Sequence, residues 1–284
     1  MSLENEIKVY FHVGTGKTGT TFLQYRVFPY LNGIYYIQRT KYKKAIKIIQ
    51  AAKHSKYLVS REFDQQLEQE VKSFSRKIPE TKPIIVFRRH DSYIASQYRR
   101  FVKNGFTGSF DDFFDLYNDS GYFKKDDLHY GRQIKILERY FTHKPLVLIY
   151  DDLRQDPQKF ILHLVEELDI SVDFQKVNFN RKHSSYSEKQ LKAILALGKY
   201  INLRKRRVFR DNILHLLWRI CINTIRYAAL YISKLLPEAF FSKEPLIPKN
   251  KLDEVREFYR EDWEQCLIYA QKTGRPVANR EGSR

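Results

Sequence analysis

Cysteine is nearly absent from this chain of 284 residues, which contains only Cys221 and Cys266. The two are isolated in the sequence, and neither shows the spacing of a metal site or of a redox pair. The chain therefore has no disulfide framework. Scarcity of cysteine also favours a reducing compartment, which for this chain would be the cytoplasm.

The sequence also lacks a segment typical of passage through a membrane. The first residues, MSLENEIK, are too acidic and contain too few apolar residues for a signal peptide. A long apolar run extends from Ile213 to Leu236, but it contains charges that argue against a transmembrane span. We expect a cytoplasmic protein that is at most peripheral to a membrane.

Acidic residues are outnumbered: the chain has 33 Asp and Glu and 51 Lys and Arg, which gives a net charge of +18. Such an excess favours an anionic partner: a nucleotide, an acidic glycan, a nucleic acid or a membrane surface. With 43% hydrophobic residues the chain can form a full core, and its length suits one α/β domain with elaborations.

The stretch KVYFHVGTGKTGTTFL, from Lys8 to Leu23, combines a strand, a glycine-rich turn and the start of a helix. Val9, Phe11 and Val13 alternate with other side chains, as in a half-buried strand. Free helix amides, together with glycines that allow close approach, make such a turn an anion site. The sequence therefore predicts a site for a phosphate-like group formed by Gly16, Lys17, Thr18, Gly19, Thr20 and Thr21.

The turn does not fit a Walker A loop, because the first glycine of that motif would fall on Phe11. HVGTGKTGTTFLQ instead resembles the 5′-phosphosulfate loop of sulfotransferases that use 3′-phosphoadenosine 5′-phosphosulfate (PAPS), in the form found in their bacterial and glycan-modifying branches. The resemblance implies PAPS as co-substrate without a metal. It also implies a P-loop-type α/β fold of three layers, with a central parallel sheet and helices on both faces.

A second polar cluster follows the apolar residues Tyr57 to Val59, which read as a buried strand. Binding residues of open α/β sheets lie at such carboxyl ends of strands. Glu62 resembles the glutamate of the S-x-E motif of these sulfotransferases, which implies a general base for the acceptor hydroxyl. Taken alone, it also fits a glutamate that complements a helix dipole. His12 and His90 are reserve candidates, because histidine is the base in the cytosolic small-molecule branch.

Another strand is expected from Ile84 to Phe87, followed by a helix. Arg88 at its carboxyl end and Ser96, eight residues further on, resemble the pair that binds the 3′-phosphate of PAPS in the family. An arginine suits that role because its guanidinium makes bidentate, charge-assisted bonds to phosphate. Arg89 is the alternative to Arg88. Lys182, in a later basic loop, resembles a lysine that approaches the nucleotide in glycan sulfotransferases, although a solvated loop explains it equally well.

Asp151 and Asp152 follow a further apolar strand, from Leu146 to Tyr150. We interpret them as caps or loop supports. An aspartate at the end of an apolar strand is also typical of a Walker B site, and it supports the alternative function of a P-loop kinase that uses ATP and Mg²⁺. A third class, a basic adaptor for nucleic acid or membrane, leaves the threonine-rich loop unexplained, so we expect no nucleic-acid partner.

The composition shifts at Arg204, where RKRRVFR places five cations in seven residues ahead of the apolar run. A narrow polar stripe that includes Arg219 and Arg226 marks the run as a helix, and we expect these two residues to hold it at a surface. The helix fits a core or dimer contact, or an interfacial helix in peripheral contact with a membrane. A last amphipathic helix is expected from Leu252 to Gly274.

We therefore predict a single domain, 1–284, with a basic, amphipathic helical elaboration at about 200–250. Its predicted function is transfer of the sulfuryl group of PAPS to an acceptor hydroxyl on a glycan, a glycolipid or a small molecule. Lys17 would neutralise charge on the leaving oxygen, and Glu62 would take the proton of the acceptor.

Overall fold

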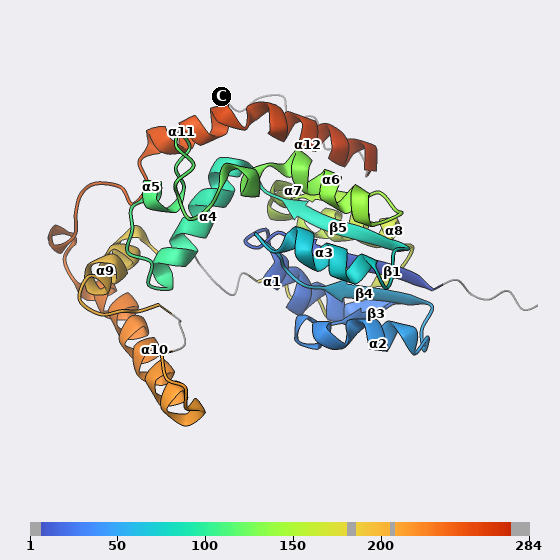
Figure 1. The fold of residues 1–284 in the computed structure, drawn as a ribbon, viewed down its shortest axis with the longest axis horizontal. Coiled ribbons are helices and arrows are strands. Elements are labelled where there is room, and N and C mark those ends of the chain that lie inside the picture. The colour runs from blue at the N-terminus through green and yellow to red at the C-terminus, as the bar shows by residue number, and fades with distance from the viewer. Residues whose placement is uncertain (1–6, 181–185, 205–207, 274–284) are drawn as a thin grey trace, which may run out of the picture. The chain divides into compact units, whose positions relative to one another are not determined.

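The computed structural model describes residues 7–180, 186–204 and 208–273. The chain forms two compact units (Figure 1). The first is built from the described parts of Met1–Arg89, Asp126–Asn180 and Tyr259–Arg284, and the second from those of His90–Lys125 and Arg181–Phe258. The elaboration expected at about 200–250 lies in the second unit.

A five-stranded parallel sheet forms the centre of the first unit, in the order β3-β4-β1-β5-β6. In this sheet Phe11 pairs with Val59 on one side and with Pro83 on the other. The strands predicted from the sequence are present, except that Tyr150 begins a helix instead of ending a strand. The strands are β1 (Lys8–Gly14), β3 (Tyr35–Ile37), β4 (Lys56–Ser60), β5 (Thr81–Phe87) and β6 (Leu146–Ile149).

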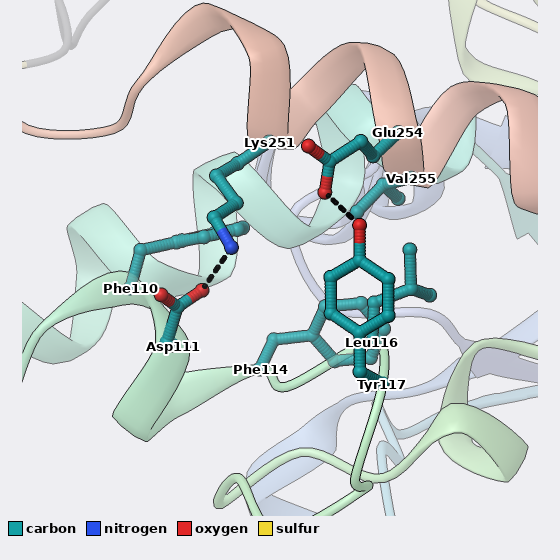
Figure 2. A pocket seen from close by; sticks show the side chains of 8 residues that line it. All are labelled: Phe110, Asp111, Phe114, Leu116, Tyr117, Lys251, Glu254 and Val255. Carbon is teal, nitrogen blue, oxygen red and sulfur yellow. Dashed lines mark hydrogen bonds and ion pairs between the residues drawn. The ribbon is translucent and has the colours of Figure 1, made fainter.

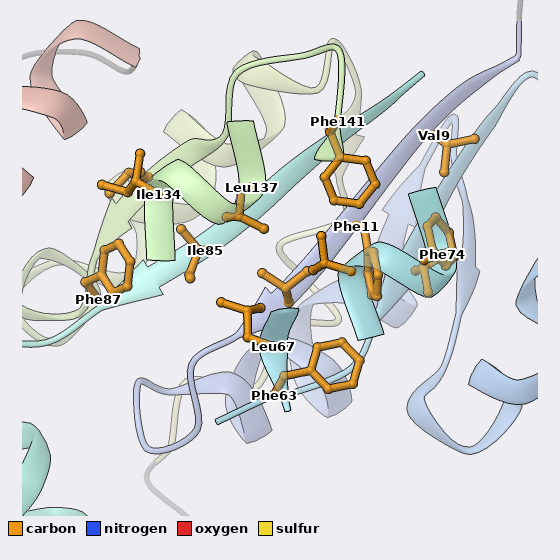
Figure 3. Packing of buried hydrophobic residues seen from close by; sticks show 14 of the residues in the cluster. Val9, Phe11, Phe63, Leu67, Phe74, Ile85, Phe87, Ile134, Leu137 and Phe141 are labelled. Carbon is orange, nitrogen blue, oxygen red and sulfur yellow. The ribbon is translucent and has the colours of Figure 1, made fainter. Parts of the chain in front are cut away.

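Helices cover both faces of this sheet, so the predicted three-layer α/β arrangement is confirmed. Val9, Phe11 and Val13 point into a core shared with helices α3 (Leu67–Ser75), α6 (Tyr130–Tyr140) and α12 (Arg260–Thr273), part of which Figure 3 shows. Tyr10 points to the opposite face, into a core shared with α8 (Pro157–Glu167). Strand residues alternate between faces, and here both faces are buried.

The strand order creates a topological switch point beside β1. From β1 the chain continues to β3 and β4 on one side, whereas from β5 it continues to β6 on the other side. The carboxyl ends of β1 and β5 are neighbours whose connections therefore run in opposite directions. Ligands of open α/β sheets bind at such a point.

Shorter elements complete the first unit. A continuous helical stretch follows the glycine-rich turn and includes one π-helical segment. A two-stranded antiparallel sheet pairs β2 with β7. The elements are α1 (Thr20–Phe22), η1 (Leu23–Val27), η2 (Phe28–Tyr30), β2 (Leu31–Asn32), η3 (Arg39–Lys44), α2 (Ala45–Gln50), η4 (Lys125–Leu128, which begins at the last residue of the second unit), α7 (Tyr150–Gln155) and β7 (Ser171–Val172).

The second unit is helical. Helix α4 (His90–Lys103) packs against α9 (Glu188–Gly198) and α11 (Lys249–Phe258), and α9 packs against α10 (Asn212–Leu235). Two short helices, α5 (Phe110–Phe113) and η5 (Glu238–Phe240), complete it.

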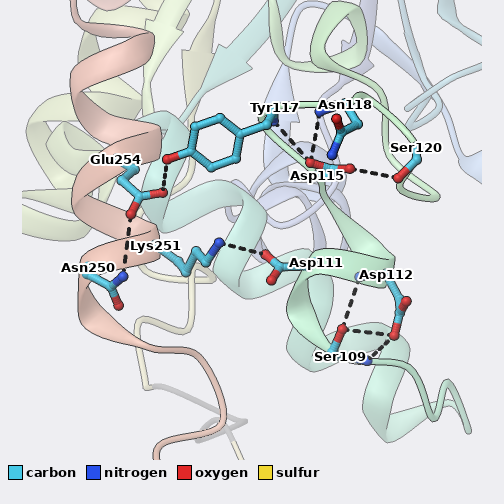
Figure 4. Close-up of polar contacts among 10 residues, drawn as sticks. All are labelled: Ser109, Asp111, Asp112, Asp115, Tyr117, Asn118, Ser120, Asn250, Lys251 and Glu254. Atoms are coloured by element: carbon cyan, nitrogen blue, oxygen red, sulfur yellow. Dashed lines mark hydrogen bonds and ion pairs between the residues drawn. The ribbon is translucent and has the colours of Figure 1, made fainter.

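The loop after α5 is organised by side-chain hydrogen bonds (Figure 4). The Asp115 carboxylate accepts from the backbone N–H of Tyr117 at 3.0 Å and from the Ser120 hydroxyl at 2.7 Å. The Tyr117 hydroxyl donates to Glu254 of α11 at 2.9 Å. The loop is thereby tied to α11 within the same unit.

The last helix differs from the sequence prediction. One helix was expected from Leu252 to Gly274, but α11 and α12 are separated at Tyr259. The two helices bury side chains in different units, Val255 in the second and Cys266 in the first. A break between them lets each follow its own core.

Candidate anion-binding site

The loop after β1 is held by its threonines. The Thr15 backbone N–H and side-chain hydroxyl both donate to the Val86 carbonyl of β5, each at 3.2 Å. The Thr18 hydroxyl donates to the Thr15 carbonyl at 2.6 Å. Thr15, Thr18 and Thr20 are buried, whereas the side chains of Lys17 and Thr21 are exposed. Of the three predicted threonines, Thr18 therefore braces the loop, Thr20 is buried and the side chain of Thr21 faces solvent.

Gly19 places the helical stretch Thr20–Tyr30 at the end of this loop. It is the N-cap of the stretch, with φ of +80°, and a Cβ there would lie 2.5 Å from Leu153 Cδ2. Only glycine fits that position without strain. The first N–H groups of a helix have no acceptor within it, and no side chain caps this one. An anion is therefore favoured beside Gly19, Thr20 and Thr21.

One amide of the loop already binds an anionic oxygen. The Gly16 N–H donates to Asp64 Oδ1 at 3.3 Å, and a Cβ on Gly16 would lie 3.1 Å from the same oxygen. The loop thus has the geometry to bind an oxyanion. Our sequence reasoning missed Asp64, although its place after β4, two residues beyond Glu62, was a signal that the strand-end rule could have used.

Arg88 lies at the carboxyl end of β5 and contacts this loop directly. Its Nη1 donates to the Lys17 carbonyl at 3.4 Å, and its guanidinium lies over the Tyr150 ring at 4.9 Å. Burial lowers the pKa of Arg88, while Tyr150 and Asp151 oppose that shift. A guanidinium remains charged in any protein, so β5 delivers a positive charge to the switch point.

Arg154 is a further cation that the sequence reasoning missed. It is close enough to Arg88 to lower the pKa of that guanidinium, and its own side chain is exposed on α7. The β1 loop, the end of β5 and the last turn of α7 therefore bring Lys17, Arg88 and Arg154 to one edge of the sheet. The only signal for Arg154 was its position four residues after the end of an apolar strand.

Glu62 lies beside the start of the loop. The N–H groups of Arg61 and Phe63 donate to the carbonyls of His12 and Val13, at 3.0 and 2.9 Å, and so continue the pairing of β4 with β1. A Cβ on Gly14 would lie 3.5 Å from the Glu62 Cα. The Glu62 side chain is half-buried. The structure thus brings together the β1 loop, Glu62 and Arg88.

Tyr36 is a neighbour of Glu62 that the sequence did not indicate. Burial raises the pKa of Tyr36, and the charge of Glu62 adds a smaller increase. The Tyr36 hydroxyl donates to the Gln24 carbonyl at 3.1 Å. Tyr36 is therefore close enough to Glu62 for the carboxylate to disfavour ionisation of the Tyr36 hydroxyl.

His12, a reserve candidate for the base, is fully buried. Burial lowers the pKa of His12 to about 3. Its Nδ1 shares a hydrogen bond of 2.8 Å with the Ser60 hydroxyl, which also accepts from Gln24 at 3.0 Å. A side chain sealed in this way has no access to an acceptor. His90, the other reserve candidate, is buried as well, so Glu62 is the most exposed of the three candidates.

Two predicted nucleotide contacts remain predictions. Ser96 lies on α4, in the second unit, and is half-buried there. Lys182 lies outside the described residues.

The two carboxylates considered for Mg²⁺ lie in the first turn of α7, where Asp151 interacts with Arg88. The cap of the next helix is Asp156, which accepts from the Lys159 N–H at 3.0 Å. Across the described residues, no cluster of three or more His, Cys, Asp or Glu side chains is arranged to hold a metal ion. In the same part of the chain, no helix has the length and apolar character to span a membrane.

Two cavities in the described residues lie away from the loop. One, in the second unit, has a volume of about 10 Å³, which is room for a single water; Figure 2 shows it between α5, the loop that follows, and α11. The other, about 450 Å³, lies along α6 and is lined mainly by charged side chains. Among these side chains, Arg132 forms an ion pair with Asp126, and Arg139 forms one with Glu68.

The first unit thus brings the glycine-rich loop with Lys17 and the side chain of Arg88 together at the switch point of a parallel sheet. No model of a known protein family matches the chain, and no curated protein matches it. Among solved structures, the chain is similar to a sulfotransferase from Alicyclobacillus acidocaldarius, with a TM-score of 0.48 and 16% sequence identity. That similarity covers 67% of this chain and 92% of the other. A function must therefore be derived from the residues of this chain.

Proposed function

We propose that this protein is a PAPS-dependent sulfotransferase that acts on a hydroxyl of a glycan or glycolipid. The observation that supports it most is the convergence of two strand ends at the switch point. The β1 loop presents Lys17 beside glycine amides, and Arg88, directly after β5, donates to the carbonyl of that same lysine. A nucleotide with phosphate groups at both its 5′ and 3′ ends needs separate cationic contacts of this kind.

The residues present suit such a ligand. The Gly16 N–H already binds a carboxylate oxygen, and Gly19 has no side chain between the helix start and an incoming group. Lys17 and Arg88 supply charge, and Thr20 and Thr21 begin the helix whose first amides face an anion. PAPS supplies an activated sulfuryl group, whose bond to the phosphate oxygen breaks as the acceptor oxygen bonds to sulfur.

Each residue then has a distinct role. Lys17 balances the negative charge that develops on the leaving oxygen, a contribution felt in the transition state and therefore in kcat. Glu62 accepts the proton of the acceptor hydroxyl. Arg88, with Ser96 as its predicted companion, binds the 3′-phosphate. The net charge of +18 suits an acidic glycan as acceptor.

The alternative enzyme class, a P-loop kinase, assigns Asp151 to Mg²⁺. In the structure that carboxylate is near the cation Arg88, and the loop is too short by one turn for a Walker A motif. Both observations favour the sulfotransferase.

Thermal unfolding with added ligands tests the proposal. A ligand at 100 times its Kd stabilises the folded state by about 2.7 kcal/mol, which shifts Tm by several degrees. We expect adenosine 3′,5′-bisphosphate to raise Tm, and ATP with Mg²⁺ or an oligonucleotide to raise it much less. Lys17→Ala should reduce the shift, whereas Lys8→Ala, an exposed lysine at the opposite end of β1, should retain it.

Two results would contradict the proposal. A larger shift with ATP and Mg²⁺ than with the bisphosphate would indicate the kinase. A shift with oligonucleotides alone would indicate the adaptor.

A further inference from the structure

Helix α10 in the second unit buries polar side chains and exposes apolar ones, which is the reverse of a normal surface helix. Its buried residues include Arg226, which is 1% exposed, and Ser233. Meanwhile six apolar or aromatic residues, each between 40 and 86% exposed, form what we call the outward face: Ile213, Leu217, Ile220, Tyr227, Tyr231 and Leu235. A helix on a water-soluble surface normally turns its apolar stripe inward.

The sequence analysis placed Arg226 at the surface, and this expectation is wrong. Arg226 lies against Asn223, to which its Nη2 donates, and its guanidinium lies 5.7 Å from the Tyr227 ring. Burial lowers the pKa of Arg226. The polar stripe of the helix therefore points partly into the unit, while Arg219 remains exposed.

Contacts with α9 keep α10 in this orientation. Ile222 and Leu230 pack with Ile194 of α9 and with Leu203, and Gln190 of α9 donates to the buried Leu230 carbonyl at 2.7 Å. Figure 1 shows α9 and α10 side by side. Turning the outward face inward would expose this cluster and break the hydrogen bond, so the outward face stays in solvent.

The outward face is too wide for a coiled-coil seam. Leu216 on one side of the six residues and Ile232 on the other are also exposed, and at 3.6 residues per turn the uncharged surface covers about half of the helix circumference. A coiled-coil seam is a narrower stripe of two positions per heptad. At 1.5 Å per residue the helix is about 36 Å long. A face of this size on a soluble protein marks an interaction site.

The charges next to the outward face identify its partner. Arg219 and Lys234 are exposed beside it, and the helix contains no Asp or Glu. Just before the helix the sequence RKRRVFR carries five cations. A second copy of the helix would bring like charges together and offer no acidic partner. An anionic lipid surface takes up the apolar face and attracts the cations that border it.

We propose that the outward face of α10 docks on anionic lipid bilayers, with the helix lying in the plane of the interface. Arg219 and Lys234 reach the headgroups while their aliphatic stems follow the apolar face. The proposal does not depend on the proposed function.

Flotation of the full chain with vesicles of equal parts phosphatidylglycerol and phosphatidylcholine tests this. We expect binding at low salt, loss of binding at high salt, and little binding to phosphatidylcholine alone. Combining Ile213→Gln, Leu217→Gln and Ile220→Gln should weaken binding by about a hundredfold, because each side chain loses apolar burial. Leu162→Gln, an exposed leucine of α8, is the matched control and should bind like the wild type.

A second pair of variants tests how much the charge beside the outward face contributes to vesicle binding. Arg219→Gln should weaken binding to the anionic vesicles by about fivefold, as expected for one cation near an anionic surface. Lys135→Gln, an exposed lysine of α6, should not change it.

A second measurement on the wild-type fold uses the native Cys221, which is exposed on α10, whereas Cys266 is buried. An environment-sensitive maleimide dye on Cys221 should shift to the blue with anionic vesicles and be quenched by lipids that carry a quencher in the acyl chain. Protein that stays at the bottom of the gradient at low salt would overturn the proposal. A dye shift that appears without vesicles and grows with protein concentration would overturn it too, since it would identify a second copy as the partner.

Discussion

The sheet of the first unit buries its apolar side chains, whereas helix α10 of the second unit exposes many of its own. Val9, Phe11 and Val13 of β1 are buried, as their alternation predicts. On α10, Ile213 and Leu235 are exposed while Arg226 is buried. An apolar pattern thus gives the period of an element reliably, but the direction in which it faces is decided by its neighbours. The two proposals divide in the same way, since the proposed nucleotide site lies in the first unit and the proposed docking face in the second.

The largest effect that would distinguish the two units is expected for Lys17→Ala, which should change turnover and leave vesicle binding unchanged. Because the lysine acts on charge that develops at the leaving group, turnover should fall by several orders of magnitude, mainly in kcat. Flotation with anionic vesicles should be unchanged, since α10 is intact. Steady-state kinetics and flotation on the same preparation measure both, and turnover equal to that of the wild type would refute the leaving-group role.

Glu62→Gln should come next, with transfer slowed by roughly 10²–10⁴-fold if the glutamate is the general base. Binding of the bisphosphate should be retained, because in the proposed mechanism the glutamate contacts the acceptor and not the nucleotide. Calorimetric titration and single-turnover transfer separate the two. If Glu62→Gln still transfers sulfate and His12→Asn does not, the general base is His12. That result would contradict the expectation from the complete burial of His12.

Arg88→Ala should weaken the bisphosphate by about 1.5–3 kcal/mol, the range for a hydrogen bond to a charged group. A nucleotide that lacks the 3′-phosphate should be weakened much less. Ser96→Ala should show the same preference with a smaller loss, since its hydroxyl is neutral. Equal weakening of both nucleotides would mean that the two residues do not contact the 3′-phosphate.

An effect that appears only as the pH is lowered concerns the buried polar groups of the two units. Burial lowers the pKa of His12 to about 3, whereas an unfolded histidine has a pKa of about 6.5. The unfolded state therefore binds the extra proton first as the pH falls. The contribution to stability is fully present above pH ~6.5 and is lost toward pH ~3, by about 1.4 kcal/mol per pH unit.

Denaturant unfolding of the wild type and His12→Asn at several pH values measures this. The difference between their free energies of unfolding should shrink as the pH falls below about 6.5. A difference independent of pH would show that the pKa of His12 is the same in the folded and unfolded states, against the shift that burial causes. Arg226 should contribute no such dependence, because a guanidinium remains charged over this range.

Much of the first unit could be predicted from the sequence because its signals are local. The strand periods, the glycine-threonine loop and the positions of Glu62 and Arg88 at strand ends all follow from short stretches of chain. Contacts between distant segments could not be predicted: Asp64 bound to Gly16 and Tyr36 beside Glu62 depend on how β3 and β4 lie against β1.

Less of the second unit could be predicted from the sequence. The length of α10 was predicted to within a residue at each end, but its orientation depends on Gln190 and Ile194 of α9, which no pattern within the helix reveals. The break at Tyr259 occurs without a glycine or proline to mark it. It reflects burial of the two halves in different units, which is a property of the folded chain and not of the local sequence.

The most direct test of the proposed function compares two donors on one acceptor. A glycan and glycolipid extract is incubated with the protein and either PAPS carrying radioactive sulfur or ATP carrying a radioactive γ-phosphate with Mg²⁺. We predict that sulfur label enters the extract with the wild type and not with Lys17→Ala, and that no phosphorus label enters. Transfer of phosphorus label by the wild type, lost in Lys17→Ala, would contradict the assignment and identify a kinase.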